Sequence, residues 1–277
     1  MDLIIQGLEI ETSDLRSLAK LSSASCIERI TGSAFRLVGA SRQDGIPLYC
    51  LDAKLDYAFV EQSVKLADFR LVAIDMDSTL VGIESIDEIA DMHGIKAQVA
   101  EITSKAMRGE INFSEGLKRR VALLQGLDQS MLHRVYDERL KLNPGAEKML
   151  KRLKTVGIRT MLISGGFTFF TDRLKEKLGL DYAAANMLEI VNGKLTGRLM
   201  GVIVGAQGKA EALKHVRNEL GLRRDQLVAI GDGANDLQMM AEAGVSIAYH
   251  AKPIVQKNAT YTINHVGLDG VINLFEG

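Results

Sequence analysis

The chain has few of the features that would place it in a specialised class of proteins. It contains two cysteines, Cys26 and Cys50, in 277 residues. They are distant in sequence and lack metal-ligand spacing, so a disulfide framework is not expected. Two incidental thiols in a reducing compartment are the expected interpretation. The net charge of −1 gives no electrostatic reason to expect binding to nucleic acid or to an anionic membrane.

Targeting and membrane segments are also missing from the pattern. The first residues lack a basic stretch and a long apolar core, so we do not expect them to form a signal peptide. No apolar run approaches the roughly 20 residues that a spanning helix needs. A cytoplasmic protein is therefore expected. The hydrophobic fraction of 47% and the charged fraction of 25% are those of an ordinary globular protein.

Residues 1–66 differ in pattern from the rest and indicate a small α+β domain. Its expected elements are a strand at 3–8, a helix at 12–21, strands within 27–38 and 46–51, and a helix at 57–66. We find no residues with evident chemistry in this segment.

From residue 69 onward, apolar runs alternate with helical patterns. Runs at 71–74, 159–163 and 227–230 have no polar alternation, which is typical of parallel strands buried on both faces. Helices are expected at 146–156, 168–178, 209–220 and 236–243. This order predicts an open α/β sheet. Each run stops at a polar cluster, and ligands of such sheets bind at the carboxyl ends of the strands.

Two inserts interrupt this alternation. Residues 83–142 contain four helical patterns, near 85–93, 96–107, 114–124 and 130–140, which predict a helical bundle able to cover a site. Residues 182–206 contain two strand-like runs joined by Asn192-Gly193, a strong hairpin signal.

The first polar cluster contains two carboxylates, Asp75 and Asp77, at a strand end. Side chains alternate along a strand, so both point the same way. An ionised aspartate can attack phosphorus without a base, and a second carboxylate can serve as acid and then base. Read alone, the pair is equally compatible with a metal site or a solvated strand end.

A second acidic cluster, Asp232 and Asp236, follows the run at 227–230. Bringing four carboxylates together would be repulsive without a cation among them. Oxygen ligands without histidine or cysteine favour Mg²⁺ over zinc. Read alone, Gly231-Asp232-Gly233 is also compatible with a simple turn.

A possible anion site follows the middle run. Ser164-Gly165-Gly166 precedes a helix, and a hydroxyl, exposed amides and a helix N-terminus together favour an anion. A flexible loop is an equally good interpretation of this segment in isolation. Lys209 alone is more typical of a solvated surface charge.

The order of these clusters resembles one family. The segments DMDSTLVGIESIDEIA, AMRGEINFSEGLKRRVALL, LISGGFTFF and GDGANDLQMMAEAG are similar to motifs of the haloacid dehalogenase-like (HAD) phosphatases, and within them to those of the phosphoserine phosphatases. The resemblance implies a Rossmann-like parallel-sheet core over residues 67–277 with a helical cap at about 83–142. Residues 1–66 only loosely resemble a regulatory domain of the ACT type.

The resemblance also implies roles for individual residues. Asp75 would accept the phosphoryl group, and Asp77 would be the general acid and base. Mg²⁺ would be held by the Asp75 and Asp232 side chains and the Asp77 carbonyl. The residues implied to contact substrate are Glu84 (ammonium), Arg120 (carboxylate), Met107 and Phe113 (side chain), and Ser164, Gly165, Lys209 and Asn235 (phosphate). Asp236 would support the lysine or the metal shell.

These roles predict Mg²⁺-dependent hydrolysis of O-phosphoserine through an aspartyl phosphate, the final step of L-serine biosynthesis. Two alternatives stay open. One is a related phosphatase or phosphotransferase acting on phosphothreonine, phosphohomoserine or another small phosphomonoester. The other is a non-catalytic amino-acid sensor. The expected partner is a small-molecule substrate, without nucleic acid or membrane, and the assembly could be a homodimer.

Overall fold

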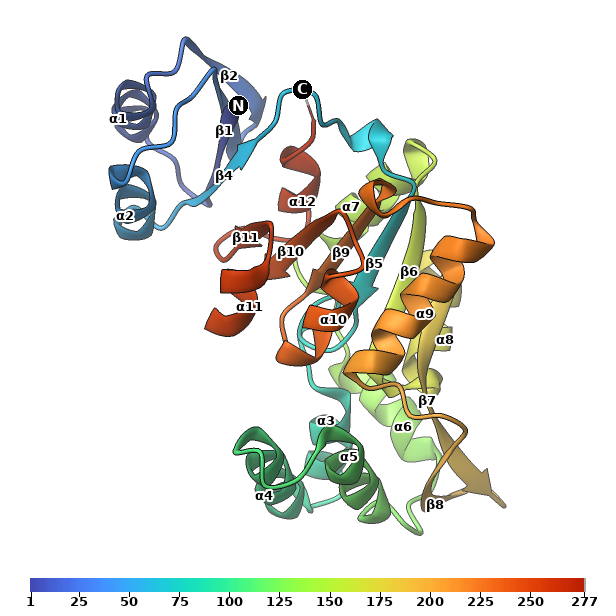
Figure 1. Cartoon of the computed structure of the whole chain (residues 1–277). Coiled ribbons are helices and arrows are strands. Elements are labelled where there is room, and N and C mark those ends of the chain that lie inside the picture. The colour runs from blue at the N-terminus through green and yellow to red at the C-terminus, as the bar shows by residue number, and fades with distance from the viewer. Residues whose placement is uncertain (277) are drawn as a thin grey trace.

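Two β-sheets organise the chain in the computed structural model, which describes residues 1–276 (Figure 1). The larger sheet has seven strands in the order β11-β10-β9-β5-β6-β7-β8. Its strands are β5 (Leu71–Asp75), β6 (Arg159–Phe167), β7 (Tyr182–Val191), β8 (Lys194–Met200), β9 (Leu227–Gly231), β10 (Val245–Tyr249) and β11 (Tyr261–Ile263). All neighbours are parallel except β7 and β8, which form an antiparallel hairpin. The predicted α/β core is confirmed, whereas β10 and β11 were not predicted.

Helices cover both faces of this sheet because its strands are apolar on both sides. One face carries α9 (Ala206–Glu219), α10 (Leu237–Met240) and α11 (Pro253–Asn258). The other carries α7 (Ala146–Thr155), α8 (Thr168–Leu178) and α12 (Gly270–Asn273). Along β5, Leu71 and Ala73 pack toward the first set, and Val72 and Ile74 pack toward the second. This alternation explains the absence of polar residues within the run.

A helical cap is inserted between β5 and α7, as predicted, and lies at the carboxyl ends of the strands (Figure 1). It comprises α3 (Ser85–Met92), α4 (Lys96–Met107), α5 (Phe113–Ala122) and α6 (Ser130–Arg134), with a π-helical turn at Val135–Arg139. Gly94, Gly109 and Gly126, which separate the predicted helices, all have positive φ. Asn192 and Gly193 also have positive φ, at 51° and 75°, and turn the β7–β8 hairpin.

The N-terminal domain has the order βαββαβ and a four-stranded antiparallel sheet, β2-β3-β1-β4. Its elements are β1 (Asp2–Gln6), α1 (Thr12–Ser22), β2 (Cys26–Thr31), β3 (Ala34–Val38), α2 (Gly45–Asp52) and β4 (Asp56–Val60). The predicted α+β class is therefore confirmed. Among residues 1–276, no helix has the length and apolar character needed to cross a membrane.

Three element predictions in this domain were wrong. The run at 27–38 forms two strands, β2 and β3, rather than one. The strand predicted at 46–51 is helix α2, which buries Ile46 and Cys50, four residues apart, and exposes Leu48. The helix predicted at 57–66 is strand β4, whose pairing with β1 outweighs a weak helical spacing. Short apolar runs do not distinguish strand from helix by periodicity.

The two faces of the small sheet have different neighbours. Leu3 and Ile5 of β1 pack against α1 and α2, whereas Ile4 packs against the large core. Polar contacts complete the junction. Gln6 donates to the Gly270 carbonyl at 3.1 Å and accepts from Asn273 at 2.8 Å.

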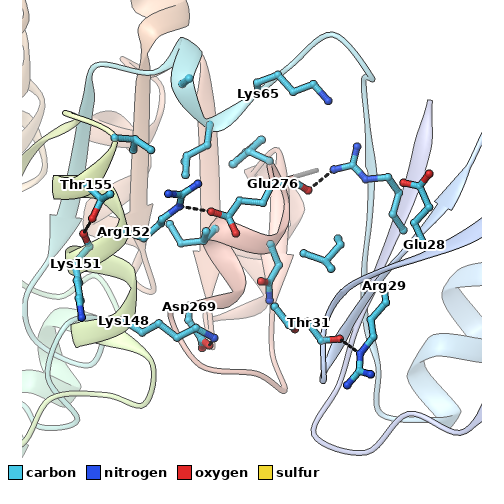
Figure 2. Close-up of a pocket in the computed structure, with 18 residues that line it drawn as sticks. Glu28, Arg29, Thr31, Lys65, Lys148, Lys151, Arg152, Thr155, Asp269 and Glu276 are labelled. Atoms are coloured by element: carbon cyan, nitrogen blue, oxygen red, sulfur yellow. Dashed lines mark hydrogen bonds and ion pairs between the residues drawn. The ribbon is translucent and has the colours of Figure 1, made fainter.

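A crevice of 1020 Å³ lies beside this junction (Figure 2). Its walls are β2, α7 and the chain around α12. Arg152 of α7 pairs with the Glu276 carboxylate, and Arg36 of β3 donates to the Glu276 carbonyl. Lys148 pairs with Asp269 at 2.8 Å. The crevice contains none of the predicted site residues.

Asp56 makes several of the hydrogen bonds that join the N-terminal domain to the rest of the chain. Its carboxylate accepts hydrogen bonds from three consecutive backbone amides, those of Asn264, His265 and Val266, at 2.6, 2.9 and 3.0 Å. Asp56 itself is 4% exposed. The N-terminal domain therefore fixes the loop that follows β11.

We expect Asp56→Ala to lower the free energy of unfolding by about 2–4 kcal/mol, because buried amides lose a charged acceptor. Urea unfolding measures the change. Asp52→Ala, at the exposed end of α2, is the matched control and should stay within about 0.5 kcal/mol of the parent. Equal unfolding midpoints for the two variants would contradict this role of Asp56.

Candidate active site

A cavity of 570 Å³ lies between the cap and the carboxyl edge of the large sheet. Asp75 ends β5, Ser164 lies in β6 and Asp232 follows β9, and these three strands are neighbours in the sheet. The predicted site residues that line the cavity are Asp75, Asp77, Glu84, Phe113, Arg120, Ser164, Gly165, Asp232 and Asn235. The structure thus brings together residues that are up to 160 positions apart, from Asp75 to Asn235.

Lys209 lies beneath the cavity rather than in its wall. Its fully buried ammonium contacts the Asp75 carboxylate at 2.5 Å and the Asp236 carboxylate at 2.7 Å. The other Asp236 oxygen accepts from the amides of Asp232 and Gly233, at 3.2 and 3.0 Å. Asp236 therefore orients both the lysine and the loop that carries Asp232.

The charges of this network shift one another's pKa values. Burial opposes the charged form of Lys209, but Asp75 and Asp236 outweigh it and raise the pKa of the ammonium above its ordinary value. Burial and then the negative charge of Asp236 raise the pKa of Asp75, while Lys209 acts in the opposite direction. One buried ammonium thus faces two buried carboxylates, and a negative charge is left over.

Asp77 lies in the loop between β5 and α3. Its two oxygens accept from the amide and the hydroxyl of Ser85, both at 3.1 Å. Burial, followed by the nearby charge of Glu84, raises the pKa of Asp77 to about 7. A carboxyl group with a pKa near neutrality suits proton transfer in both directions.

Three carboxylates could hold a cation. One oxygen from each of Asp75, Asp232 and Asp236 lies within 4.8 Å of the other two. Asp236 is already engaged by Lys209 and two amides, so Asp75 and Asp232 are the freer ligands. Burial and the charge of Asp236 raise the pKa of Asp232 to about 6. Oxygen ligands with surplus negative charge fit a hard divalent cation such as Mg²⁺.

The Ser164 region offers donors to an anion. The Ser164 hydroxyl oxygen accepts from the Gly166 amide at 2.9 Å, which leaves its own hydrogen available to the cavity. Asn186 donates to the Gly165 carbonyl at 2.9 Å and fixes this end of β6. Asn235 also lines the cavity.

The cap supplies the opposite wall. Arg120 of α5 is half-buried, and burial lowers the pKa of its guanidinium while Asp87, Glu84 and Asp77 oppose that shift. Glu84 precedes α3 and accepts from the Ser78 hydroxyl at 2.7 Å. Phe113 begins α5 and lies over the backbone of Gly165. Met107 ends α4, but its side chain lies outside the described part of the structure.

Several residues at the site were not predicted, among them Thr79, Ser85, Asp87 and Lys252. Thr79 donates to Asp232 at 3.1 Å, and Ser85 contacts Asp77. Asp87 lines the cavity near Arg120, and Lys252 lines it after β10, with its amide bonded to the Asp232 carbonyl. Thr79 lies within the DMDST segment and could have been found there. Lys252 follows a strand that the sequence pattern did not reveal.

Comparisons with known proteins agree with this geometry. A sequence model of the haloacid dehalogenase-like hydrolases matches residues 72–241, and one of a domain of unknown function (DUF4072) matches residues 3–46. The chain is 50% identical over 216 residues to a phosphoserine phosphatase of a Polaromonas species, which covers 76% of this chain and 92% of that protein.

Two solved structures are also similar. A probable phosphoserine phosphatase from Vibrio cholerae superposes with a TM-score of 0.88 at 36% identity, over 99% of this chain and 86% of that one. A phospho-aspartyl intermediate analogue of a phosphoserine phosphatase superposes with a TM-score of 0.70 at 39% identity, over 75% of this chain and 99% of that one. The first comparison includes the N-terminal domain, and the second shares the core and cap.

The raised pKa values predict a pH-dependent stability. Carboxyl groups whose folded pKa exceeds the ordinary 3.8 bind protons that the unfolded chain has already released. In EDTA, their contribution should therefore be lost as the pH rises from about 5 to about 8, through the folded values of Asp77 and Asp232. Mg²⁺ should offset the loss, because it favours ionised carboxylates.

Urea unfolding at about pH 5 and about pH 8, with EDTA or with Mg²⁺, measures this pH dependence of the stability. Asp232→Asn removes one of the titrating groups and should reduce both the pH dependence and the Mg²⁺ response. An EDTA-treated protein whose stability rises steadily over this pH range would contradict the proposed origin of the raised pKa values.

Proposed function

Because the chain belongs to the haloacid dehalogenase-like hydrolases, we propose that it acts within that family as a phosphoserine phosphatase. It hydrolyses O-phosphoserine to serine and phosphate. The observation that carries this function is the pairing of Asp75 with Lys209 at the floor of a cavity whose roof holds Arg120. The proposed phosphoryl acceptor, Asp75, and the guanidinium proposed to bind the substrate carboxylate, that of Arg120, thus line the same cavity.

The reaction starts with the Asp75 carboxylate. It attacks phosphorus and forms an acyl phosphate, while the bond between phosphorus and the serine oxygen breaks. Asp77 gives its proton to that oxygen. Asp77 then removes a proton from the water that attacks the acyl phosphate, which releases phosphate and restores Asp75. Ser164, the Gly165 amide and Asn235 hold the phosphate oxygens, and Lys209 supports the site from beneath through its pairing with Asp75.

Mg²⁺ is the cation that the donor set supports best. Asp75 and Asp232 would hold it with their side chains, and Asp77 with its carbonyl. When bound, the ion neutralises phosphoryl oxygens as charge develops in the transition state. Four carboxylates near one buried ammonium support this assignment, and so does the absence of histidine and cysteine from the described cavity lining.

The cap binds the amino-acid part of the substrate. Free phosphoserine carries an ammonium and a carboxylate besides its phosphate. Glu84 binds the ammonium, and the planar guanidinium of Arg120 binds the carboxylate. Phe113 closes over the short side chain, and the same role for Met107 stays a prediction from the sequence. This arrangement favours a small amino-acid phosphate over a large phosphomonoester.

Phosphothreonine and phosphohomoserine are the alternatives from the same chemistry. Phosphate release from a panel of these esters and phosphoserine, in Mg²⁺, tests the assignment directly. An amino-acid sensor is less well supported, because it needs neither the Asp75 nucleophile nor Lys209. The domain limits at 1–66 and 67–277, an ACT-like regulatory role, a homodimer and a cytoplasmic location remain predictions from the sequence.

Asp75→Asn should abolish turnover and leave the fold intact, because an amide cannot form the acyl phosphate. Asp77→Asn should slow turnover by about 10²–10⁴-fold. Mass spectrometry of acid-quenched protein, together with phosphate release, separates the two steps. Asp172→Asn, on the exposed side of α8, is the control. Parent-like turnover by Asp75→Asn would overturn the mechanism.

Arg120→Ala should lower kcat/KM for phosphoserine by roughly 10- to 100-fold, since the substrate carboxylate loses a charged partner. The loss should be small with p-nitrophenyl phosphate, which has no carboxylate. Arg119→Ala is the matched control, because Arg119 is exposed and pairs with Glu115 at 2.6 Å. Equal losses of kcat/KM on both substrates would mean that Arg120 binds the phosphate or stabilises the fold.

A further inference from the structure

Asp77 is held by the cap and not by the sheet that carries the other carboxylates. Both of its oxygens accept hydrogen bonds from one residue, Ser85, through the amide and the hydroxyl. Ser85 is the first residue of α3, and it is 1% exposed. The position of the cap helix thus determines how the Asp77 carboxyl group is turned.

The space around this contact is full. A Cβ atom added to Gly166 would lie 2.8 Å from Asp77 Oδ2 and 3.0 Å from Ser85 Oγ. The Asp77 carboxyl group is therefore confined between the start of α3 and the backbone of β6. Ser85 and Asp77 both line the cavity, so their contact lies at its wall.

Proton transfer depends on direction as well as on the presence of an acid. A general acid must present its proton along a hydrogen bond to the departing oxygen. A carboxyl group that rotates about its last bond loses that alignment. Two donors from one rigid helix start prevent the rotation, because each oxygen of Asp77 has a separate partner.

We infer that Ser85 is a positioning residue that aligns Asp77 for proton transfer to the leaving serine oxygen. The inference rests on the proposed function. It assigns to the cap a part in the proton transfer in addition to its part in substrate recognition.

The dependence on the leaving group tests this role. Serine leaves as an alkoxide and needs a proton, whereas p-nitrophenolate leaves without one. Ser85→Ala should lower kcat/KM for phosphoserine by roughly 10- to 100-fold and that for p-nitrophenyl phosphate by only a few fold. Ser130→Ala, which alters the exposed first residue of α6, is the matched control and should change neither value.

A double-mutant cycle with Asp77→Asn separates positioning from folding. If Ser85 acts through Asp77, Ser85→Ala should have little further effect in the Asp77→Asn background. Ser85→Thr keeps the hydroxyl and should retain more activity on phosphoserine than Ser85→Ala. Equal losses on both substrates, or full additivity with Asp77→Asn, would overturn the inference.

The same experiment distinguishes failure of the proposed function. If the parent enzyme does not hydrolyse phosphoserine but hydrolyses another alkyl phosphate, phosphoserine is not its substrate. The Ser85 comparison is then made between that alkyl ester and p-nitrophenyl phosphate, where the same selective loss is expected and equal losses again overturn the role of Ser85.

Discussion

The buried ion pair between Lys209 and its two carboxylates is the contact on which the site depends. It joins the first turn of α9, the end of β5 and the loop after β9. Removing Lys209 from this network would leave two buried carboxylates without a counter-charge, at a cost of about 3–5 kcal/mol. Because Asp236 also accepts from the amides of Asp232 and Gly233, the pair fixes the Asp232 loop and the Asp75 carboxylate together.

The charge balance of the cavity follows from that arrangement. Lys209 compensates one of the two carboxylates that it touches, and Asp77 and Asp232 add further negative charge. Burial raises the pKa values of Asp75, Asp77 and Asp232, and nearby negative charge, from Asp236 for Asp75 and Asp232 and from Glu84 for Asp77, raises them further. The floor of the cavity is thus suited to a cation bound together with a phosphate, while Arg120 provides positive charge in the roof.

Sequence reasoning succeeded where a pattern was long or where a motif followed a buried strand. The three apolar runs gave neighbouring parallel strands, so the polar clusters that follow them had to share one edge. It failed for short segments such as 46–51, where the burial of Ile46 and Cys50 depends on a sheet formed by distant residues. It also missed Ser85 and Lys252, because neither residue type signals a role until tertiary contacts place it beside Asp77 or Asp232.

The glycines at the boundary between cap and core show what the sequence alone could not decide. Ser164-Gly165-Gly166 was equally compatible with a flexible loop, yet Gly165 and Gly166 do not have positive φ, and they belong to strand β6. These glycines matter because they have no side chain. A Cβ at Gly165 would lie 3.2 Å from the Phe113 ring, and one at Gly205 would lie 2.8 Å from it. A side chain at either position would displace Phe113, so these glycines allow Phe113 of the cap to approach the backbone of the core closely.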